Sequence, residues 1–153
     1  MRVAPLHIRI KIPLLSSAVE QSVKHHNMRY HDYHINEYRV SDRGETITFD
    51  LVFGYPENVT DQSTITFSEV ALYNFVHTNN AIVTDIYEVS IADLFKEIGP
   101  AVIEWNRMHG VKGFNGSSVQ YIEGLQSQGY VAWCIESAIG FYGFIIAKAV
   151  KNA

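Results

Sequence analysis

Polar and apolar residues alternate without error from Thr46 to Phe53, and this alternation predicts a β-strand with one buried face. A period of two places successive side chains on opposite sides of a sheet. The buried face of this strand carries Ile47, Phe49, Leu51 and Phe53. Similar patterns predict further strands at residues 7–12, 31–40, 63–70 (with Ile65 and Phe67 towards the core) and 82–87.

Turn-forming residues separate these strands. Gly44 closes the turn that begins at Ser41, because glycine is free to take a positive φ angle. Residues 54–58 break the next strand, and Asn79-Asn80 marks another turn. Residues 72–77 fit either a strand end or a helical turn. We expect the strands between residues 30 and 87 to meet in one antiparallel sheet.

The most apolar segment runs from Tyr130 to Val150, and its length invites comparison with a membrane-spanning helix. Glu136 and Ser137 fall near its middle, and a central acid costs about 2.5–3.5 kcal/mol on insertion. We therefore expect two strands instead, at residues 130–137 and 141–150, joined around residues 138–140.

Helical spacing appears in four places. A capping pattern predicts a short helix at residues 17–26. Ser90 caps a second helix, whose apolar stripe is formed by Ile91, Leu94, Phe95 and Ile98. Gly99-Pro100 stops or kinks this helix, and residues 102–108 suggest another helical piece. After a glycine-containing loop at residues 109–116, a last helix carries Val119, Ile122 and Leu125 and ends at Gly129.

These elements predict one α+β domain over residues 1–153, with a mainly antiparallel, curved sheet and two or three helices packed against it. Hydrophobic residues at 47% and charged residues at 18% exclude a disordered or fibrous chain. The strand at residues 7–12 is a candidate edge strand, so a homodimer stays open.

The net charge of −4 is unevenly distributed along the chain. Residues 45–104 carry ten acids against Lys96 alone, whereas residues 1–31 are basic. A nucleic-acid surface needs clustered Lys and Arg, so we expect no nucleic-acid partner. The acidic stretch is either a solvated surface or a face that steers a basic protein.

One cysteine, Cys134, cannot form an internal disulfide, which fits a reducing compartment and a cytoplasmic location. The first residues lack a long apolar run, and Arg9 and Lys11 would interrupt one, so we expect no signal peptide. Cys134 lies in an apolar strand, where burial raises the pKa of a thiol and makes it inert.

Histidines are the clearest candidates for chemistry, because His25, His26, His31 and His34 lie close together in the sequence. On a strand, Asp32 and His34 share a face, whereas His31 points to the other side. No spacing specifies a third metal ligand, so we expect neither a metal nor another cofactor. The glycine-rich residues 113–118 lack the ending of a phosphate loop, and no spacing brings two carboxylates together.

Tyrosines cluster in the acidic half of the chain, and tyrosine is a favoured anchor in protein interfaces. A surface that combines acids with tyrosines suits an inhibitor of a basic protein. The same tyrosines also suit a position at the rim of the core, with their hydroxyls in water. The residues we expect in a partner-binding face are Asp32, Tyr33, Glu37, Tyr55, Glu57, Asp61, Glu69 and Tyr73.

The order of strands from Tyr30 to Glu88 resembles small bacterial immunity proteins of polymorphic and contact-dependent toxin systems, and related β-rich bacterial families. The resemblance lies in a His-Asp pair at the first core strand, followed by the alternating strand at Thr46–Leu51 and by strands like residues 63–70 and 81–86. It implies a cytoplasmic binder without catalysis, which neutralises a toxin domain.

Two hypotheses therefore remain. The first is a non-enzymatic protein-binding module, with a basic toxin domain as the partner and occlusion of its active site as the mechanism. The alternative is a curved sheet that binds a small ligand, or a metal-dependent, hydrolase-like site that uses His31, Asp32 and His34. No three reactive side chains are positioned by the sequence to act together, which favours the first.

Overall fold

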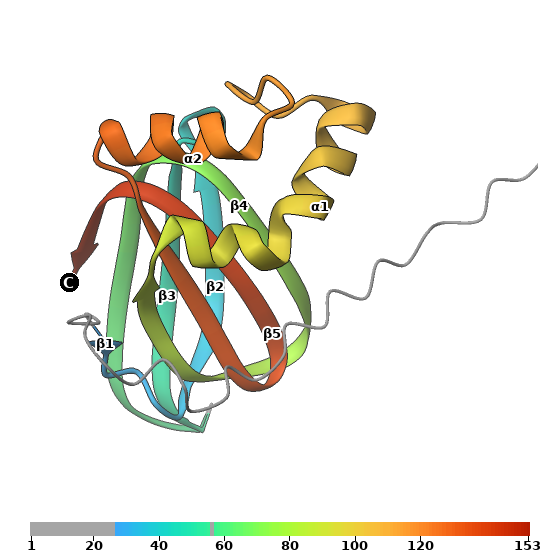
Figure 1. The fold of residues 1–153 in the computed structure, drawn as a ribbon. Coiled ribbons are helices and arrows are strands. Elements are labelled where there is room, and N and C mark those ends of the chain that lie inside the picture. The colour runs from blue at the N-terminus through green and yellow to red at the C-terminus, as the bar shows by residue number, and fades with distance from the viewer. Residues whose placement is uncertain (1–26, 56) are drawn as a thin grey trace, which may run out of the picture.

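Two long antiparallel strands, β4 (Asn58–Val89) and β5 (Val131–Asn152), run through the computed structural model, which describes residues 27–55 and 57–153 (Figure 1). β3 (Thr46–Tyr55) pairs with the first part of β4, and β2 (Tyr33–Ser41) pairs with β3. β1 (Asn27–Met28) pairs with the second part of β4. These pairings are all antiparallel, as predicted. A single 3-10 turn, η1 (Asp42–Gly44), joins β2 to β3 at the predicted place.

The length of β4 forces the sheet to bend. Its 32 residues would span about 100 Å if fully extended, which is far longer than a domain of this size is wide. Glu69 and Asn80 in β4 take positive φ angles of 52° and 53°, and Gly140 in β5 takes 84°. The register between the two strands shifts beside each of these residues. Such bulges bend a paired ribbon without ending it.

Two predicted turns are therefore wrong. Asn79-Asn80 does not reverse the chain, and residues 138–140 do not join two strands into a hairpin, because β4 and β5 each continue through these positions. Residues 63–70, 72–77 and 82–87 all belong to the single strand β4. Asparagine and glycine tolerate the left-handed backbone that bulges and turns both need. At both positions the structure uses that tolerance for a bulge.

Bending brings the start of β2 against the second part of β4, where Tyr33 pairs with Val83 and His34 with Ile82. The concave side of the sheet is filled by a core that includes the fully buried Ile47, Phe67 and Ile145. Aromatic rings contact one another across it, with centroids 5.2 to 6.1 Å apart among Tyr38, Phe49, Phe75 and Phe141. The predicted buried face of β3 is buried at Ile47, Phe49 and Leu51, whereas Phe53 is 40% exposed.

The other side of β4 and β5 is covered by two helices, α1 (Ile91–His109) and α2 (Ser118–Ser127), as Figure 1 shows. Ser90 caps α1 by accepting a hydrogen bond from the backbone N–H of Asp93 at 3.0 Å. The predicted stripe of Ile91, Leu94, Phe95 and Ile98 is buried against Cys134, Phe144 and Ile146. The α+β prediction is confirmed, with two helices on an antiparallel sheet.

Helix α1 continues through Gly99-Pro100, so the prediction of a stop is wrong and that of a kink describes the fold better. Pro100 has no backbone N–H to donate to the preceding turn, which is why proline bends helices. Figure 1 shows α1 changing direction part-way along its length. Residues 102–108 form its second half rather than a separate helix.

In α2, Tyr121 and Leu125 face the core, whereas Val119 is 65% exposed. The predicted strand at residues 7–12 and the predicted helix at 17–26 lie outside the described residues. None of the helices among the described residues is long and apolar enough to cross a membrane, and the apolar segment from Tyr130 to Val150 lies almost entirely in β5.

Candidate functional site

The tight hairpin between β3 and β4 brings several predicted partner-binding residues together. Tyr55 pairs with Asn58, Phe53 pairs with Asp61, and Tyr33 on β2 lies beside Phe53. Gly54 allows the tight approach, because its φ angle is 102° and a side chain there would collide with the backbone carbonyl of Asn58. We call this surface the hairpin end; it consists of Asp32, Tyr33, Phe53, Tyr55, Glu57, Val59 and Asp61.

Aromatic side chains are unusually exposed at the hairpin end. Tyr55 is 78% exposed, Phe53 is 40% exposed and Val59 is 39% exposed. Tyr33 packs between Tyr30 and Phe53, with ring centroids 5.2 and 5.3 Å away, and its hydroxyl donates a hydrogen bond to Asp61. This hydrogen bond to a carboxylate is the main reason why the pKa of Tyr33 is raised. The hairpin end is therefore an exposed aromatic surface with acids around it.

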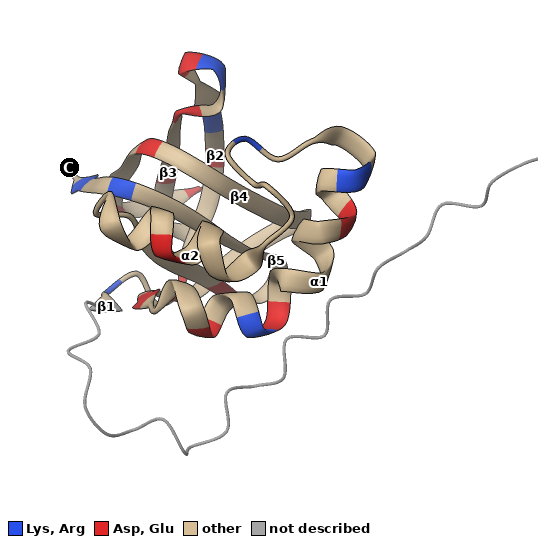
Figure 2. Ribbon diagram, turned by 45° about the horizontal axis from the view of Figure 1, so that its top comes forward, with Lys and Arg blue, Asp and Glu red and all other residues tan. Residues whose placement is uncertain are grey.

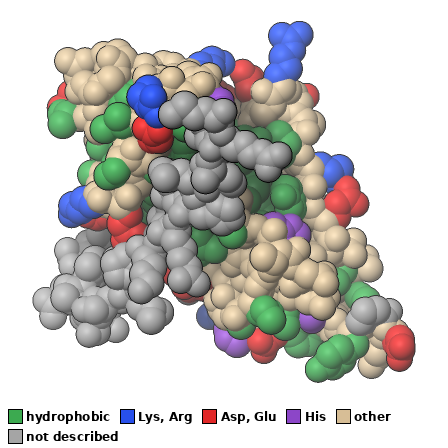
Figure 3. All heavy atoms as spheres, turned by 90° about the vertical axis from the view of Figure 1, so that its right-hand side faces the viewer, with side chains coloured by type: hydrophobic (Ala, Val, Ile, Leu, Met, Phe, Trp, Pro, Cys, Tyr) green, Lys and Arg blue, Asp and Glu red, His purple; other side chains and the backbone are tan. Residues whose placement is uncertain are grey.

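Exposed hydrophobic side chains elsewhere are spread more widely. Among the described residues, ten large hydrophobic side chains are exposed, and three of them lie on the β3–β4 hairpin. The others lie on several different elements: Val40, Tyr73, Val76, Ile103, Met108, Val119 and Ile139. Figure 3 shows one face of the molecule, on which hydrophobic side chains are interspersed with charged ones and histidines.

Three acids, Asp32, Glu57 and Asp61, lie at the hairpin end. Asp32 takes a φ angle of 67° and lies 3.1 Å from Nδ1 of the exposed His31. None of the described lysines or arginines forms an ion pair with Asp32, Glu57 or Asp61. Asp61 instead accepts hydrogen bonds from the hydroxyl of Tyr33 and from the backbone N–H of Gln62.

Three predicted partner-binding residues lie apart from the hairpin end. Glu37 lies further along β2 and pairs with Arg39 at 3.0 Å. Glu69 lies near the opposite end of β3 and pairs with Lys148 at 3.0 Å. Tyr73 lies further along β4, is 37% exposed, and packs on Phe75 with ring centroids 5.3 Å apart. The fold thus brings together five of the eight predicted residues.

The acidic excess of residues 45–104 is also reduced by the fold. At least five of its ten acids form ion pairs with bases among the described residues, and four of these bases come from outside that stretch. Figure 2 shows acidic and basic positions side by side on α1. The negative face inferred from the sequence is therefore narrower than expected. The pairs are Asp50–Arg39, Glu104–Arg107, Glu45–Lys112, Glu69–Lys148 and Asp93–Lys96.

The alternative metal site at His31, Asp32 and His34 does not come together in the fold. His31 and Asp32 form an exposed pair in the turn before β2, with side chains 71% and 65% exposed. His34 lies within β2, between Val52 of β3 and Ile82 of β4. Within residues 27–55 and 57–153, no three His, Cys, Asp or Glu residues are grouped so that they could hold a metal ion.

A second group of titratable residues lies between α1 and the sheet. The hydroxyl of Tyr87 donates to Oε1 of Glu136 at 2.7 Å, and burial together with this bond raises the pKa of Tyr87. Cys134 is buried, and burial raises the pKa of its thiol to about 12, helped by the carboxylates of Glu136 and Glu97. The prediction that this thiol is buried and has a raised pKa is therefore confirmed.

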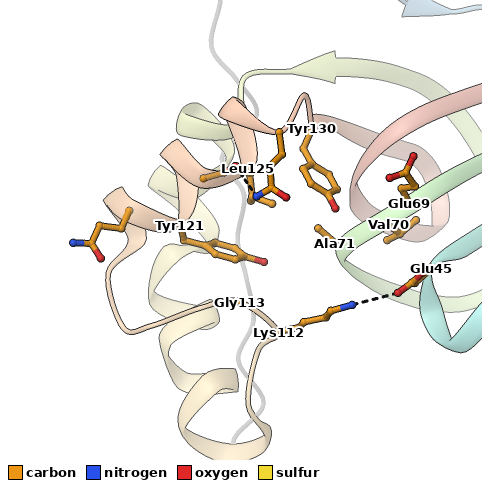
Figure 4. Close-up of a pocket in the computed structure, with 12 residues that line it drawn as sticks. Glu45, Glu69, Val70, Ala71, Lys112, Gly113, Tyr121, Leu125 and Tyr130 are labelled. Atoms are coloured by element: carbon orange, nitrogen blue, oxygen red, sulfur yellow. Dashed lines mark hydrogen bonds and ion pairs between the residues drawn. The ribbon is translucent and has the colours of Figure 1, made fainter.

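A pocket of about 350 Å³ opens between α2, the loop before it and the end of the sheet near η1 (Figure 4). Its sheet side carries the carboxylates of Glu45 and Glu69. Its helix side carries Tyr121, and Tyr130 follows α2. Lys112 enters from the loop, with Nζ 3.2 Å from Oε1 of Glu45. The remaining lining residues are Val70, Ala71, Gly113, Gln120, Gly124, Leu125 and Gln128.

Tyr121 was missed by sequence reasoning, which gave attention to Val119, Ile122 and Leu125. Tyr121 is 7% exposed, and its hydroxyl has no hydrogen-bond partner among the described residues. Burial raises the pKa of Tyr121, with a further contribution from Tyr130. The available signal was the spacing of Tyr121 and Leu125 by four residues, which places both on one helix face.

Comparisons with known proteins add little to this geometry. No family model matches the chain, and no curated protein matches it. Among solved structures, the chain is similar to the crystal structure of an uncharacterized protein from Neisseria gonorrhoeae, with a TM-score of 0.47 and 13% sequence identity. The match covers 85% of this chain and 97% of that chain.

Proposed function

We propose that this chain is a non-enzymatic protein-binding module that holds a basic protein surface against its hairpin end. The observation that supports this best is Tyr55, which is 78% exposed at the tip of a tight hairpin, beside Phe53 and three acids without a Lys or Arg partner among the described residues. Exposed aromatic groups surrounded by polar residues are typical of binding surfaces.

Each part of the hairpin end has a separate physical role in such a complex. Tyr55 and Phe53 provide apolar area with few rotatable bonds, so their immobilisation on binding costs little entropy. Glu57 and Asp61 attract a basic partner and raise the association rate. The hairpin is held by backbone pairing on both sides of β3, so much of the surface is already arranged before binding.

Among protein-binding modules, we propose the class of toxin inhibitors, which the resemblance to bacterial immunity proteins suggests. The hairpin end would then cover a basic active site and exclude its substrate. The single buried thiol fits a reducing location such as the cytoplasm. If a toxin is encoded beside this gene and the purified protein inhibits it, the inhibitor class is supported. If the protein binds the neighbouring gene product without inhibiting it, the protein is a binding module but not an inhibitor.

The binding surface is tested with the product of the neighbouring gene as the partner and calorimetric titration as the measurement. We expect Tyr55→Ala to weaken the affinity at least about tenfold, since truncating a central aromatic anchor costs roughly 2 kcal/mol. We expect Glu57→Lys to lower the association rate and reduce its dependence on salt.

Two matched variants control for nonspecific effects. Val119→Ala removes an exposed hydrophobic side chain from α2, and Glu123→Lys reverses an exposed charge on the same helix. Both should leave the affinity unchanged. Equal losses for Tyr55→Ala and Val119→Ala, or no effect of Tyr55→Ala on a complex that does form, would show that the partner binds elsewhere.

A further inference from the structure

The hydroxyl of Tyr121, at the pocket beside α2, has no hydrogen-bond partner within residues 27–55 and 57–153. Its ring packs against Phe114 and Phe95, with centroids 5.4 and 5.8 Å away, so the side chain is fixed in place. Figure 4 shows the ring extending from α2 into the pocket, with the hydroxyl towards the sheet side. A buried hydroxyl without a hydrogen bond destabilises the fold. A bound molecule that supplies this hydrogen bond would remove that cost.

The opposite wall of the pocket presents two carboxylates. The backbone N–H of Val70 donates to the carbonyl of Glu45 at 3.0 Å, which places Glu45 beside the bulge at Glu69. Each carboxylate meets a lysine: Glu45 is 3.2 Å from Lys112, and Glu69 is 3.0 Å from Lys148. Lys112 is 87% exposed, and such exposed ion pairs contribute little stability. Lys112 is therefore free to exchange Glu45 for another anion.

Gly124 leaves this side of α2 without a side chain. It lies inside the helix, where glycine is less favourable than alanine, and it lines the pocket. A Cβ atom added at Gly124 would meet no heavy atom within 4 Å, so packing does not require glycine here. The space that it leaves adds to a pocket of about 350 Å³, which is large enough for a small molecule.

We infer that this pocket binds a small zwitterion of the α-amino acid type. Its ammonium group donates hydrogen bonds to the carboxylates of Glu45 and Glu69 and to the hydroxyl oxygen of Tyr121. Its carboxylate accepts from Lys112, which turns away from Glu45. A ligand with both charges satisfies the two kinds of group that line the pocket, whereas an amine or an acid alone satisfies one kind. This site is distinct from the hairpin end, which lies at the other end of β3.

The test is a titration of the full chain with the proteinogenic L-amino acids. Binding is measured from the chemical shifts of the backbone amides and by calorimetry. We expect at least one amino acid to bind at millimolar concentration or below, with the largest shifts at Gly113 and Gly124. We expect the amide of that amino acid, which lacks the carboxylate, and its N-acetyl form, which lacks the ammonium group, to bind at least about tenfold more weakly.

Two variants separate binding from folding. Tyr121→Phe removes one oxygen that lacks a partner, so the melting temperature should stay the same or rise while the amino acid binds about tenfold more weakly. Gly124→Leu fills the pocket with a good helix former and should abolish binding in a folded protein. Val119→Leu, on the exposed face of α2, should change neither property.

The inference is overturned if no amino acid binds the parent protein at millimolar concentration. It is equally overturned if a bound amino acid is unaffected by Gly124→Leu, which would place it outside this pocket. A clear loss of stability in Tyr121→Phe would show that the hydroxyl already has a structural partner such as water, and would also contradict the inference.

Discussion

Burial controls the chemistry of Cys134. The pKa of its thiol is raised from 9.0 to about 12, mainly because the ionised form would lie in an apolar core. An acid whose pKa is higher in the folded state than in the unfolded state keeps its proton longer when folded. The folded state is therefore favoured less as the pH rises from 9 towards 12.

This shift predicts how a Cys134→Ala variant behaves. At neutral pH we expect the variant to be less stable than the parent, because a buried sulfur is lost. Above pH 9 the parent loses the contribution of the protonated thiol and the variant does not. The difference in the free energy of unfolding should shrink by roughly 1–2 kcal/mol at about pH 10.5. Urea denaturation across this range measures it, and a constant difference would contradict the raised pKa.

At the scale of the element, a glycine determines how closely β4 and β5 approach. A Cβ atom at Gly143 would lie 2.5 Å from a ring carbon of Phe75 and 2.7 Å from the carbonyl oxygen of Asn74. We expect Gly143→Ala to push Phe75 out of the aromatic core and to lower the free energy of unfolding by about 1–3 kcal/mol. Denaturation followed by circular dichroism measures the loss.

Gly124→Ala is the matched control, because the added methyl group meets no heavy atom within 4 Å. We expect that variant to gain about 0.5–1 kcal/mol from its higher helix propensity. The two alanine substitutions should therefore shift the denaturation midpoint in opposite directions. A shift in the same direction for both would mean that close contact is not the reason for glycine at position 143.

Many elements were predictable from local patterns, and the two wrong turns share one cause. The alternation in Thr46–Phe53 and the stripe of α1 identified a strand and a helix correctly, because both depend on neighbouring residues. Asn80 and Gly140 were assigned to turns and are bulges instead. What decides between the two is whether the partner strand continues, and that pairing joins residues far apart in the sequence.

At the scale of the whole molecule, one sheet separates two cores. Ile145 and Ile146 are neighbours in β5, both fully buried, and they face the concave core and the helix-side core respectively. Because β4 and β5 contribute to both cores, neither core can be lost while the other keeps its full packing. We therefore expect the molecule to unfold in a single transition.

The two tryptophans report on the two cores separately. Trp133 lies in the concave core, with its ring 6.2 Å from that of Phe67, and Trp105 packs against the helix-side core. In the Trp105→Phe variant the remaining Trp133 reports on the concave core. In the Trp133→Phe variant the remaining Trp105 reports on the helices. Each variant is also denatured under circular dichroism, so that its own stability is known. Relative to that reference, we expect the fluorescence midpoints of the two variants to coincide. Earlier loss of the Trp105 signal would show that the helices detach first.

The candidate sites show the same limit at the molecular scale. Five of the residues chosen from the sequence lie together at the hairpin end, because β2, β3 and β4 follow one another in the chain and pair as neighbours. Sequence patterns did not find the pocket, whose walls come from Glu45, Lys112 and Tyr121, three segments that meet only after β4 and β5 have paired. Some of the ion pairs that reduce the acidic excess are equally non-local, since they join Glu69 to Lys148 and Glu45 to Lys112, whereas Asp93–Lys96 and Glu104–Arg107 are pairs within α1.

The long pairing of β4 with β5 has a consequence for how the chain folds. Val89 and Ala132, at one end of the ribbon, are separated only by the loop and the two helices, whereas Thr64 and Ala153 are separated by both strands as well. Closing the shorter loop first costs less chain entropy. Pairing of β4 with β5 should therefore begin near the helices and proceed towards Thr64 and Ala153. The hairpin end, where Tyr55 of β3 pairs with Asn58 of β4, closes a much shorter loop and can form independently of that ribbon.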